Sequence, residues 1–215
     1  MPAPYPQSRP HTGHWTLRDV LALPEDTTHR TELARGGLLT SPRPALAHQR
    51  VSHRLHTLLE RSARESGADV EILAAVNVIV PDGLLIPDLV IADARAAHNA
   101  DLALHAHDIL TVIEIVSPTT HHTDHTLKPT LYATAAIPHY WRLDLPPAAP
   151  GPQPLGPQPL GPQPSGPQPP GLQLTTGHLR ANTYVDHLHA LPGDHHVHLT
   201  DPFPVTLDLE ALARP

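Results

Sequence analysis

Apolar residues recur at helical spacing along one long segment of the chain, residues 45–66. A stripe with this period buries one side of a helix and leaves the other side in water. The segment is followed by Gly67, and glycine commonly ends helices in a left-handed conformation. The pattern therefore predicts a long amphipathic helix, whose apolar stripe consists of Leu46, Val51, Leu55, Leu58 and Leu59.

After Gly67 the pattern changes to short runs of β-branched residues, which are typical of strands. These runs are "VEILAAVNVIV" (residues 70–80), "LLIPDLVIAD" (84–93) and "ILTVIEIVS" (109–117). The first two are joined by Pro81-Asp82-Gly83, a sequence that favours a tight turn. We expect a hairpin at this point and a third strong strand after it.

Shorter patterns fill the rest of the chain. Thr16 and Asp19 are spaced to cap a short helix reciprocally. The remaining predictions are a strand pair around Gly36-Gly37, a loop or short helix at 94–108, a helix at 124–136, a strand at 139–145, and a hairpin at 172–185 that turns at Thr176-Gly177. Helices and strands that alternate in this way indicate a mixed α/β fold.

A proline-rich tract interrupts this order. Residues 146–171 repeat a five-residue unit, as in "GPQPLGPQPLGPQPSGPQPP". The tract cannot bury apolar surface, so we expect a disordered loop insertion within one domain. The predicted organisation is a flexible N-terminus (1–14), a core (15–145), the repeat loop (146–171), and C-terminal strands with a short helix that complete the same domain (172–215).

Composition restricts the class of protein. The 215 residues carry a formal net charge of -7, with 14 basic and 21 acidic residues, and no cysteine. An acidic balance argues against a protein that coats DNA, but less against an enzyme that uses a divalent metal to meet phosphates. We see no apolar segment long enough for a membrane span and no secretory signal, so we expect a cytoplasmic protein.

Two carboxylates stand out because they lie in or beside predicted strands. Glu114 is in the middle of "TVIEIVS", and Asp88 begins the strand "DLVIAD". A buried carboxylate is costly unless it is paired or binds a metal. Carboxylates on neighbouring strands can converge on a hard cation such as Mg²⁺. The alternatives are a salt bridge or an exposed strand end for Glu114, and turn chemistry after Pro87 for Asp88.

Lys128 is the only lysine in a chain with 13 arginines. An ammonium group fits beside an attacking water or a phosphate oxygen where a planar guanidinium does not. The alternative is a surface lysine that is present by chance. Pro129 follows directly, and proline is accepted only near the start of a helix. A helix that begins near Lys128 would aim its amine correctly, whereas a helix capped by Asp124 could turn it away.

A specific resemblance rests on four parts of the chain: "TELARGGLLTSP", His48-Gln49, "IPDLVIAD" and "VIEIVSPTTHHTDHTLKPTLYATAAIPHYWRLDL". They resemble the Uma-type putative restriction endonuclease family, within the PD-(D/E)XK nuclease superfamily. The resemblance extends over about residues 15–145 and implies a restriction-endonuclease-like fold, with a mixed central sheet flanked by helices and a metal site at one end of the sheet.

The resemblance also implies roles for individual residues. Asp88 and Glu114 match the motif acids that hold Mg²⁺, for which Mn²⁺ could substitute. Val116 occupies the position where the superfamily usually has a lysine, and Lys128 matches a lysine that replaces it from the next helix. Glu32 matches an upstream acid that supports the metal or the water. The expected activity is hydrolysis of DNA phosphodiester bonds. We also expect a homodimer, because cutting two strands often uses two sites.

Other candidates are weaker. A catalytically silent member of the family, kept as a binding module, is the main alternative to an enzyme. The histidine-rich segments 121–125 and 194–198 could bind Zn²⁺, although we favour solvated loops because histidine is abundant throughout the chain. His48, Arg50 and Arg54 could face phosphate, but we interpret them as an exposed polar helix face.

Overall fold

The computed structural model describes residues 13–24, 26, 28–117, 123–146, 171–194 and 196–214. Its centre is a mixed sheet of six strands in the order β11-β10-β9-β8-β6-β3. Only β8 and β9 run parallel to each other in this sheet; the other neighbours are antiparallel. The strands are β3 (Val70–Ala74), β6 (Leu89–Asp93), β8 (Ile109–Val116), β9 (His139–Asp144), β10 (Gln173–Arg180) and β11 (Thr183–Ala190).

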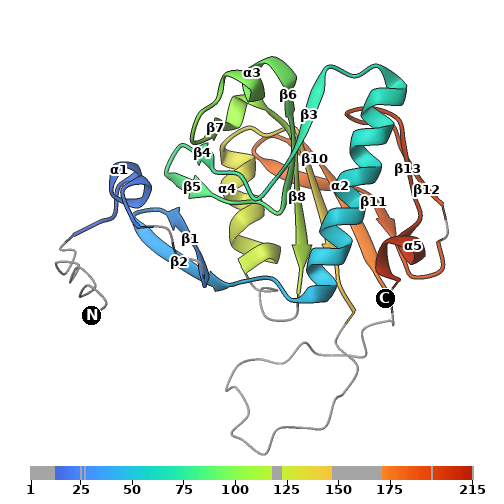
Figure 1. The fold of residues 1–215 in the computed structure, drawn as a ribbon, viewed down its shortest axis with the longest axis horizontal. Coiled ribbons are helices and arrows are strands. Elements are labelled where there is room, and N and C mark those ends of the chain that lie inside the picture. The colour runs from blue at the N-terminus through green and yellow to red at the C-terminus, as the bar shows by residue number, and fades with distance from the viewer. Residues whose placement is uncertain are drawn as a thin grey trace, which may run out of the picture.

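Helices cover both faces of the central sheet (Figure 1). On one face, Ile113 and Ile115 of β8 pack in a cluster with α2 (Leu46–Ser66). On the other face, Val112 packs in a cluster with α4 (Lys128–Thr134). Side chains alternate along a strand, so Glu114 points to the same face as Val112. The lone glutamate of this strand is therefore placed under α4.

A second sheet has the strand order β2-β1-β5-β4-β7. Its strands are β1 (His29–Ala34), β2 (Gly37–Pro42), β4 (Val78–Val80), β5 (Gly83–Leu85) and β7 (Leu104–His105). The predicted hairpin of residues 70–93 is present, but it is divided between the two sheets: its tip is β4–β5 and its base is β3–β6. The residues from 86 to 88 connect the sheets, and Asp88 is the last of them.

The remaining elements lie around these sheets. Arg54 of α2 donates hydrogen bonds to carbonyl groups near the end of the last helix, at Ala211 and Leu212. No described helix is long and apolar enough to cross a membrane. The elements outside the two sheets and the two covering helices are α1 (Leu17–Leu21), α3 (Ala94–Asn99), the 3₁₀ turn η1 (Ala106–Asp108), the π turn η2 (Thr123–Leu127), β12 (Val197–Leu199), β13 (Val205–Leu207) and α5 (Leu209–Ala213).

The predicted fold class, a mixed sheet flanked by helices, is confirmed. Thr16 and Asp19 form the expected capping box of α1, and Gly67 ends α2 with a φ of 70°. Most of the repeat tract, residues 147–170, and residues 1–12 lie outside the described residues, so the domain division remains a prediction.

One predicted turn is wrong. The hairpin of β10 and β11 turns at Ala181-Asn182, whereas Thr176 and Gly177 lie inside β10 at a shift in register. A two-residue hairpin loop of type I′ has positive φ at both positions, and Ala181 and Asn182 have φ of 44° and 63°. Asparagine accepts this conformation well, so the turn forms without a glycine.

Gly83 allows β5 to approach β1 closely. A Cβ at this position would lie 2.0 Å from the carbonyl oxygen of Leu33, whereas a Cβ at Gly37 would lie 3.6 Å from its nearest neighbour. We predict that Gly83→Ala lowers the free energy of unfolding by about 1–3 kcal/mol through this clash. Gly37→Ala, the matched control, should change it by less than about 0.5 kcal/mol. Urea denaturation measures both, and equal effects would contradict this account.

Candidate active site

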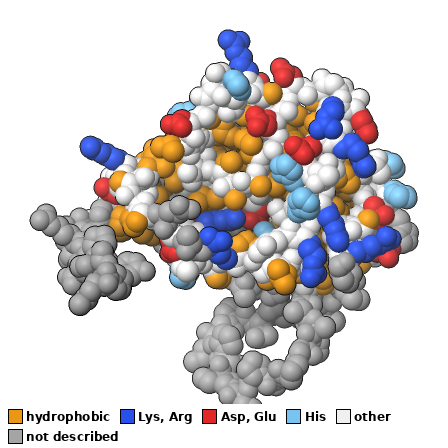
Figure 2. All heavy atoms as spheres, viewed as in Figure 1, with side chains coloured by type: hydrophobic (Ala, Val, Ile, Leu, Met, Phe, Trp, Pro, Cys, Tyr) orange, Lys and Arg blue, Asp and Glu red, His pale blue; other side chains and the backbone are white. Residues whose placement is uncertain are grey.

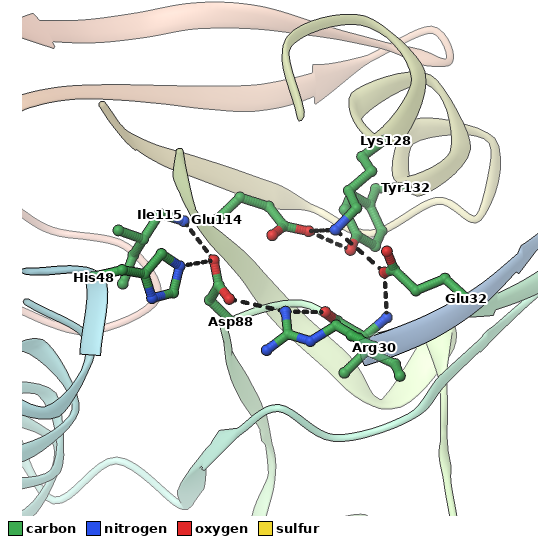
Figure 3. Close-up of polar contacts among 9 residues, drawn as sticks. Arg30, Glu32, His48, Asp88, Glu114, Ile115, Lys128 and Tyr132 are labelled. Carbon is green, nitrogen blue, oxygen red and sulfur yellow. Dashed lines mark hydrogen bonds and ion pairs between the residues drawn. The ribbon is translucent and has the colours of Figure 1, made fainter. Parts of the chain in front are cut away.

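The register of the central sheet places Asp88 beside Glu114. Leu89 of β6 pairs with Ile113 of the antiparallel strand β8, so the next two positions facing each other are Asp88 and Glu114. Cross-strand neighbours on one face have Cβ atoms about 5 Å apart, and Figure 3 shows the two side chains next to each other. Both are buried, with 6% and 1% of their surface exposed.

Asp88 is bound on both of its oxygens. Arg30 Nη1 donates to Oδ1 at 2.9 Å, while His48 Nε2 lies 3.0 Å from Oδ2. The backbone N–H of Ile115 also donates to Oδ2, at 2.8 Å. Burial alone would raise the pKa of Asp88, but the hydrogen bond and charge of His48, the charge of Arg30 and this N–H lower it to about 2. Asp88 is therefore a carboxylate throughout the physiological range.

Lys128 lies between two acids. Its Nζ is 3.1 Å from Glu114 Oε1 and 3.2 Å from Glu32 Oε1. Tyr132, one turn further along α4, donates its hydroxyl to Glu114 Oε1 at 2.7 Å. Burial and the charges of Glu114 and Glu32 raise the pKa of Tyr132 well above its ordinary value. The hydroxyl therefore remains a donor to Glu114.

Pro129 does not turn Lys128 away from the acids. The α-helix α4 begins at Lys128, so Pro129 lies in its first turn. The π turn η2 runs directly into α4, because Leu127 already has helical φ and ψ. The helical stretch therefore begins before Lys128, and the amine nevertheless points to Glu114 and Glu32.

Strand β1 holds the segment that precedes Asp88. Glu32 Oε1 accepts the backbone N–H of Ile86 at 2.7 Å, and Arg30 Nη1 donates to the carbonyl of Ile86 at 3.0 Å. Residues 30 and 32 point to the same side of β1 because strand side chains alternate. Two side chains from the second sheet therefore fix the backbone just before Asp88 and also contact Asp88 and Lys128 (Figure 3).

An open cleft of about 430 Å³ reaches Asp88 from the side of α2. Its lining includes Arg30, Asp88 and the α2 residues His48, Ser52 and His53. Glu114 and Lys128 are not part of this lining, so other residues separate them from the cleft. Figure 2 shows basic and acidic side chains interspersed over the face that α2 covers. The cleft is thus the opening through which a ligand could meet Asp88.

The structure brings together all four predicted residues, Asp88, Glu114, Lys128 and Glu32, but their catalytic roles remain predictions. The interpretation of His48 as part of an exposed helix face is wrong, because His48 is buried against Asp88. Arg30 and Tyr132 also contact these acids and were not among the predicted site residues. Their signal was weak: Arg30 is two residues from Glu32 on one strand, and Tyr132 is one helical turn from Lys128.

The histidine-rich segments give no support to a Zn²⁺ site. His125 contacts Asp144 at 2.8 Å, and His198 contacts Thr206 at 2.9 Å. Within the described part of the chain, no group of three or more His, Asp or Glu side chains is arranged to hold a metal ion. His121, His122 and His195 lie outside the described residues.

Comparisons with known proteins identify the family of the chain. Residues 17–211 match the family Uma2, which is described as "Putative restriction endonuclease". The chain belongs to this family, and membership supports a nuclease function. No curated protein matches the sequence.

A solved structure gives independent support for the fold. The chain is similar to the crystal structure of "a putative nuclease belonging to DUF820" from Anabaena variabilis, with a TM-score of 0.62 and 14% sequence identity. The match covers 93% of this chain and 97% of the other. At this identity, the likeness concerns the fold alone.

The buried Asp88 generates a prediction about stability and pH. Its pKa is about 2 in the folded protein and 3.8 in an ordinary environment, so it stabilises the fold above about pH 5 and loses this effect as the pH falls through 3.8 towards 2. The loss amounts to about 2 kcal/mol. Denaturation of the native chain and Asp88→Asn at pH 5 and pH 2 should reveal a stability difference that shrinks by this amount. A difference that stays constant would contradict the contacts of Asp88.

Proposed function

We propose that the protein is an endonuclease that uses Mg²⁺, or Mn²⁺, to hydrolyse DNA phosphodiester bonds. The observation that carries the proposal is the position of the only lysine. Lys128 Nζ lies within hydrogen-bonding distance of Glu114 and Glu32, and Glu114 lies beside Asp88 at the end of two neighbouring strands. A pair of carboxylates that can hold a metal ion, with an amine nearby to stabilise developing negative charge, is suited to phosphodiester hydrolysis.

The donor atoms of the site fit a hard divalent cation in kind. Mg²⁺ prefers oxygen ligands, takes only one or two carboxylates from the protein and keeps several waters. Asp88 and Glu114 would hold it. The cluster contains three carboxylates but only one guanidinium and one amine. Its acids therefore outnumber its bases, and a cation would balance the remaining negative charge. When bound, the cation would polarise a phosphoryl oxygen and favour deprotonation of a water.

The residues of the chain would then have separate tasks. Lys128 would orient the attacking water and stabilise the negative charge that develops on the phosphorus oxygens. Tyr132 and Lys128 hold Glu114 in one orientation through Oε1. Glu32 keeps the amine of Lys128 in place and fixes the backbone at Ile86. Each role depends on a contact that can be removed by one substitution.

DNA is the proposed substrate because the cleft offers donors to a phosphate beside Asp88. Arg30, His48, Ser52 and His53 line it, and phosphate contacts of this kind position nucleic acids without reading their sequence. The net charge of -7 means that attraction would be local to the cleft. Cleavage of both strands often uses two sites, which is our reason to propose a homodimer. A cytoplasmic location is a separate part of the proposal.

The alternative is a silent member of the family that binds without cleaving. One observation favours it: both oxygens of Asp88 already have partners, including the positive guanidinium of Arg30. The place of Lys128 near Asp88, beside two acids, is what supports an enzyme. The two functions differ in whether purified protein cleaves DNA.

Nicking of a supercoiled plasmid in Mg²⁺ or Mn²⁺ tests the proposal. Glu114→Gln removes a proposed metal ligand and Lys128→Ala removes the amine, so each should reduce the rate at least about 100-fold. Glu71→Gln changes an exposed glutamate of β3 and should leave the rate unchanged. Circular dichroism checks that the variants are folded.

Equal nicking by all four proteins would identify a contaminating nuclease and reject the assignment. A folded native chain that does not nick DNA in either metal would favour the silent alternative.

A further inference from the structure

Arg30 stands between the open cleft and the deepest part of the site. Its guanidinium donates to Asp88 Oδ1 at 2.9 Å, and it is also part of the cleft lining. Its side chain is 19% exposed, whereas that of Lys128 is 6% exposed and lies outside the lining. Of these two cations, Arg30 is therefore the one that a ligand in the cleft can reach.

The contacts of Asp88 leave little room for a cation. Oδ2 accepts from the N–H of Ile115 and contacts His48 Nε2, which uses both acceptor positions of that oxygen. Oδ1 is bound by Arg30. A divalent cation at Asp88 would therefore share Oδ1 with a guanidinium of the same sign, and like charges this close repel strongly.

Two contacts hold Arg30 in place. Its Nη1 lies 2.9 Å from Asp88 Oδ1 and 3.0 Å from the carbonyl oxygen of Ile86. Arg30 thus supplies positive charge to a carboxylate that a metal would also bind. A phosphate is a suitable competing partner for Arg30, because a guanidinium binds carboxylates and phosphates with the same fork of donors.

We propose that Arg30 is a substrate-released latch on the metal site. Without DNA it occupies Asp88; when a DNA phosphate enters the cleft, Arg30 turns to the phosphate and leaves Oδ1 of Asp88 open to a divalent cation. Metal and DNA then bind cooperatively, and the free protein binds metal weakly. The inference rests on the proposed function, since it assumes a metal at Asp88 and a DNA phosphate in the cleft.

Charge removal at position 30 separates the two ligands. Arg30→Gln keeps a donor for the carbonyl of Ile86 but removes the charge that competes with metal. We expect it to bind Mn²⁺ at least tenfold more tightly than the native chain in the absence of DNA, and to bind DNA at least tenfold more weakly. Arg30→Lys retains the charge and should keep the weak metal binding of the native chain.

Isothermal titration with Mn²⁺ measures metal affinity, and fluorescence anisotropy of a labelled duplex measures DNA affinity. Arg61→Gln is the matched control, because Arg61 is an exposed arginine of α2 that forms an ion pair with Glu65; it should behave as the native chain in both measurements. Thermal unfolding confirms that each variant is folded. Arg30→Gln that binds Mn²⁺ no more tightly than the native chain would overturn the latch.

The native chain alone provides a second test of the latch. Binding affinities are coupled reciprocally, so Ca²⁺, used as a metal that binds without supporting cleavage, should raise the affinity for DNA at least tenfold in the native chain and much less in Arg30→Gln. Equal DNA affinity of the native chain with and without Ca²⁺ would overturn the latch even if Arg30→Gln fails to fold.

The latch and the nuclease proposal fail separately. A native chain that nicks plasmid in Mg²⁺, with Arg30→Gln showing no gain in Mn²⁺ affinity, rejects the latch and leaves the nuclease. A native chain that nicks no DNA, with Arg30→Gln gaining Mn²⁺ affinity, rejects the nuclease and leaves the competition of Arg30 with metal at Asp88.

Discussion

The site depends on one buried amine. Lys128 Nζ joins Glu114, on the central sheet, to Glu32, on the second sheet. Burial removes the hydration of these two carboxylates, and their negative charges repel each other at this short separation. A cation between them offsets both costs. The amine therefore holds the two sheets together at the place where the chain crosses from one to the other. Asp88 lies at that crossing. The residues that hold the two sheets together are therefore the same ones that we propose for catalysis.

This arrangement explains why the hairpin of residues 70–93 is divided. The break between β5 and β6 leaves Ile86 to be held by the side chains of Arg30 and Glu32. Strand β6 begins only at Leu89, and the N–H of Ile115 on the neighbouring strand donates to the side chain of Asp88 instead. The same side chain lines the cleft.

Much of the fold followed from local patterns. The helix of residues 46–66 and the strand around Glu114 have strong periodicity and clear ends, so they were predictable without tertiary information. The division of residues 70–93 between two sheets and the turn at Ala181-Asn182 depend on pairing between distant strands, which no local pattern records. Glu114 stood out because it is charged within an apolar strand, and Lys128 because it is the only lysine of the chain. Arg30 did not stand out, and His48 was interpreted as exposed, because their burial arises only when β1 and α2 pack around Asp88.

The central claim is that Asp88 and Glu114 share one divalent cation. Anomalous diffraction from crystals of the chain with Mn²⁺ and a short DNA duplex tests it most directly. The account predicts one manganese peak within about 2.4 Å of a carboxylate oxygen of each residue, with Lys128 still beside Glu114. A peak bound elsewhere, or none at this pair of acids in crystals that contain the duplex, would contradict it.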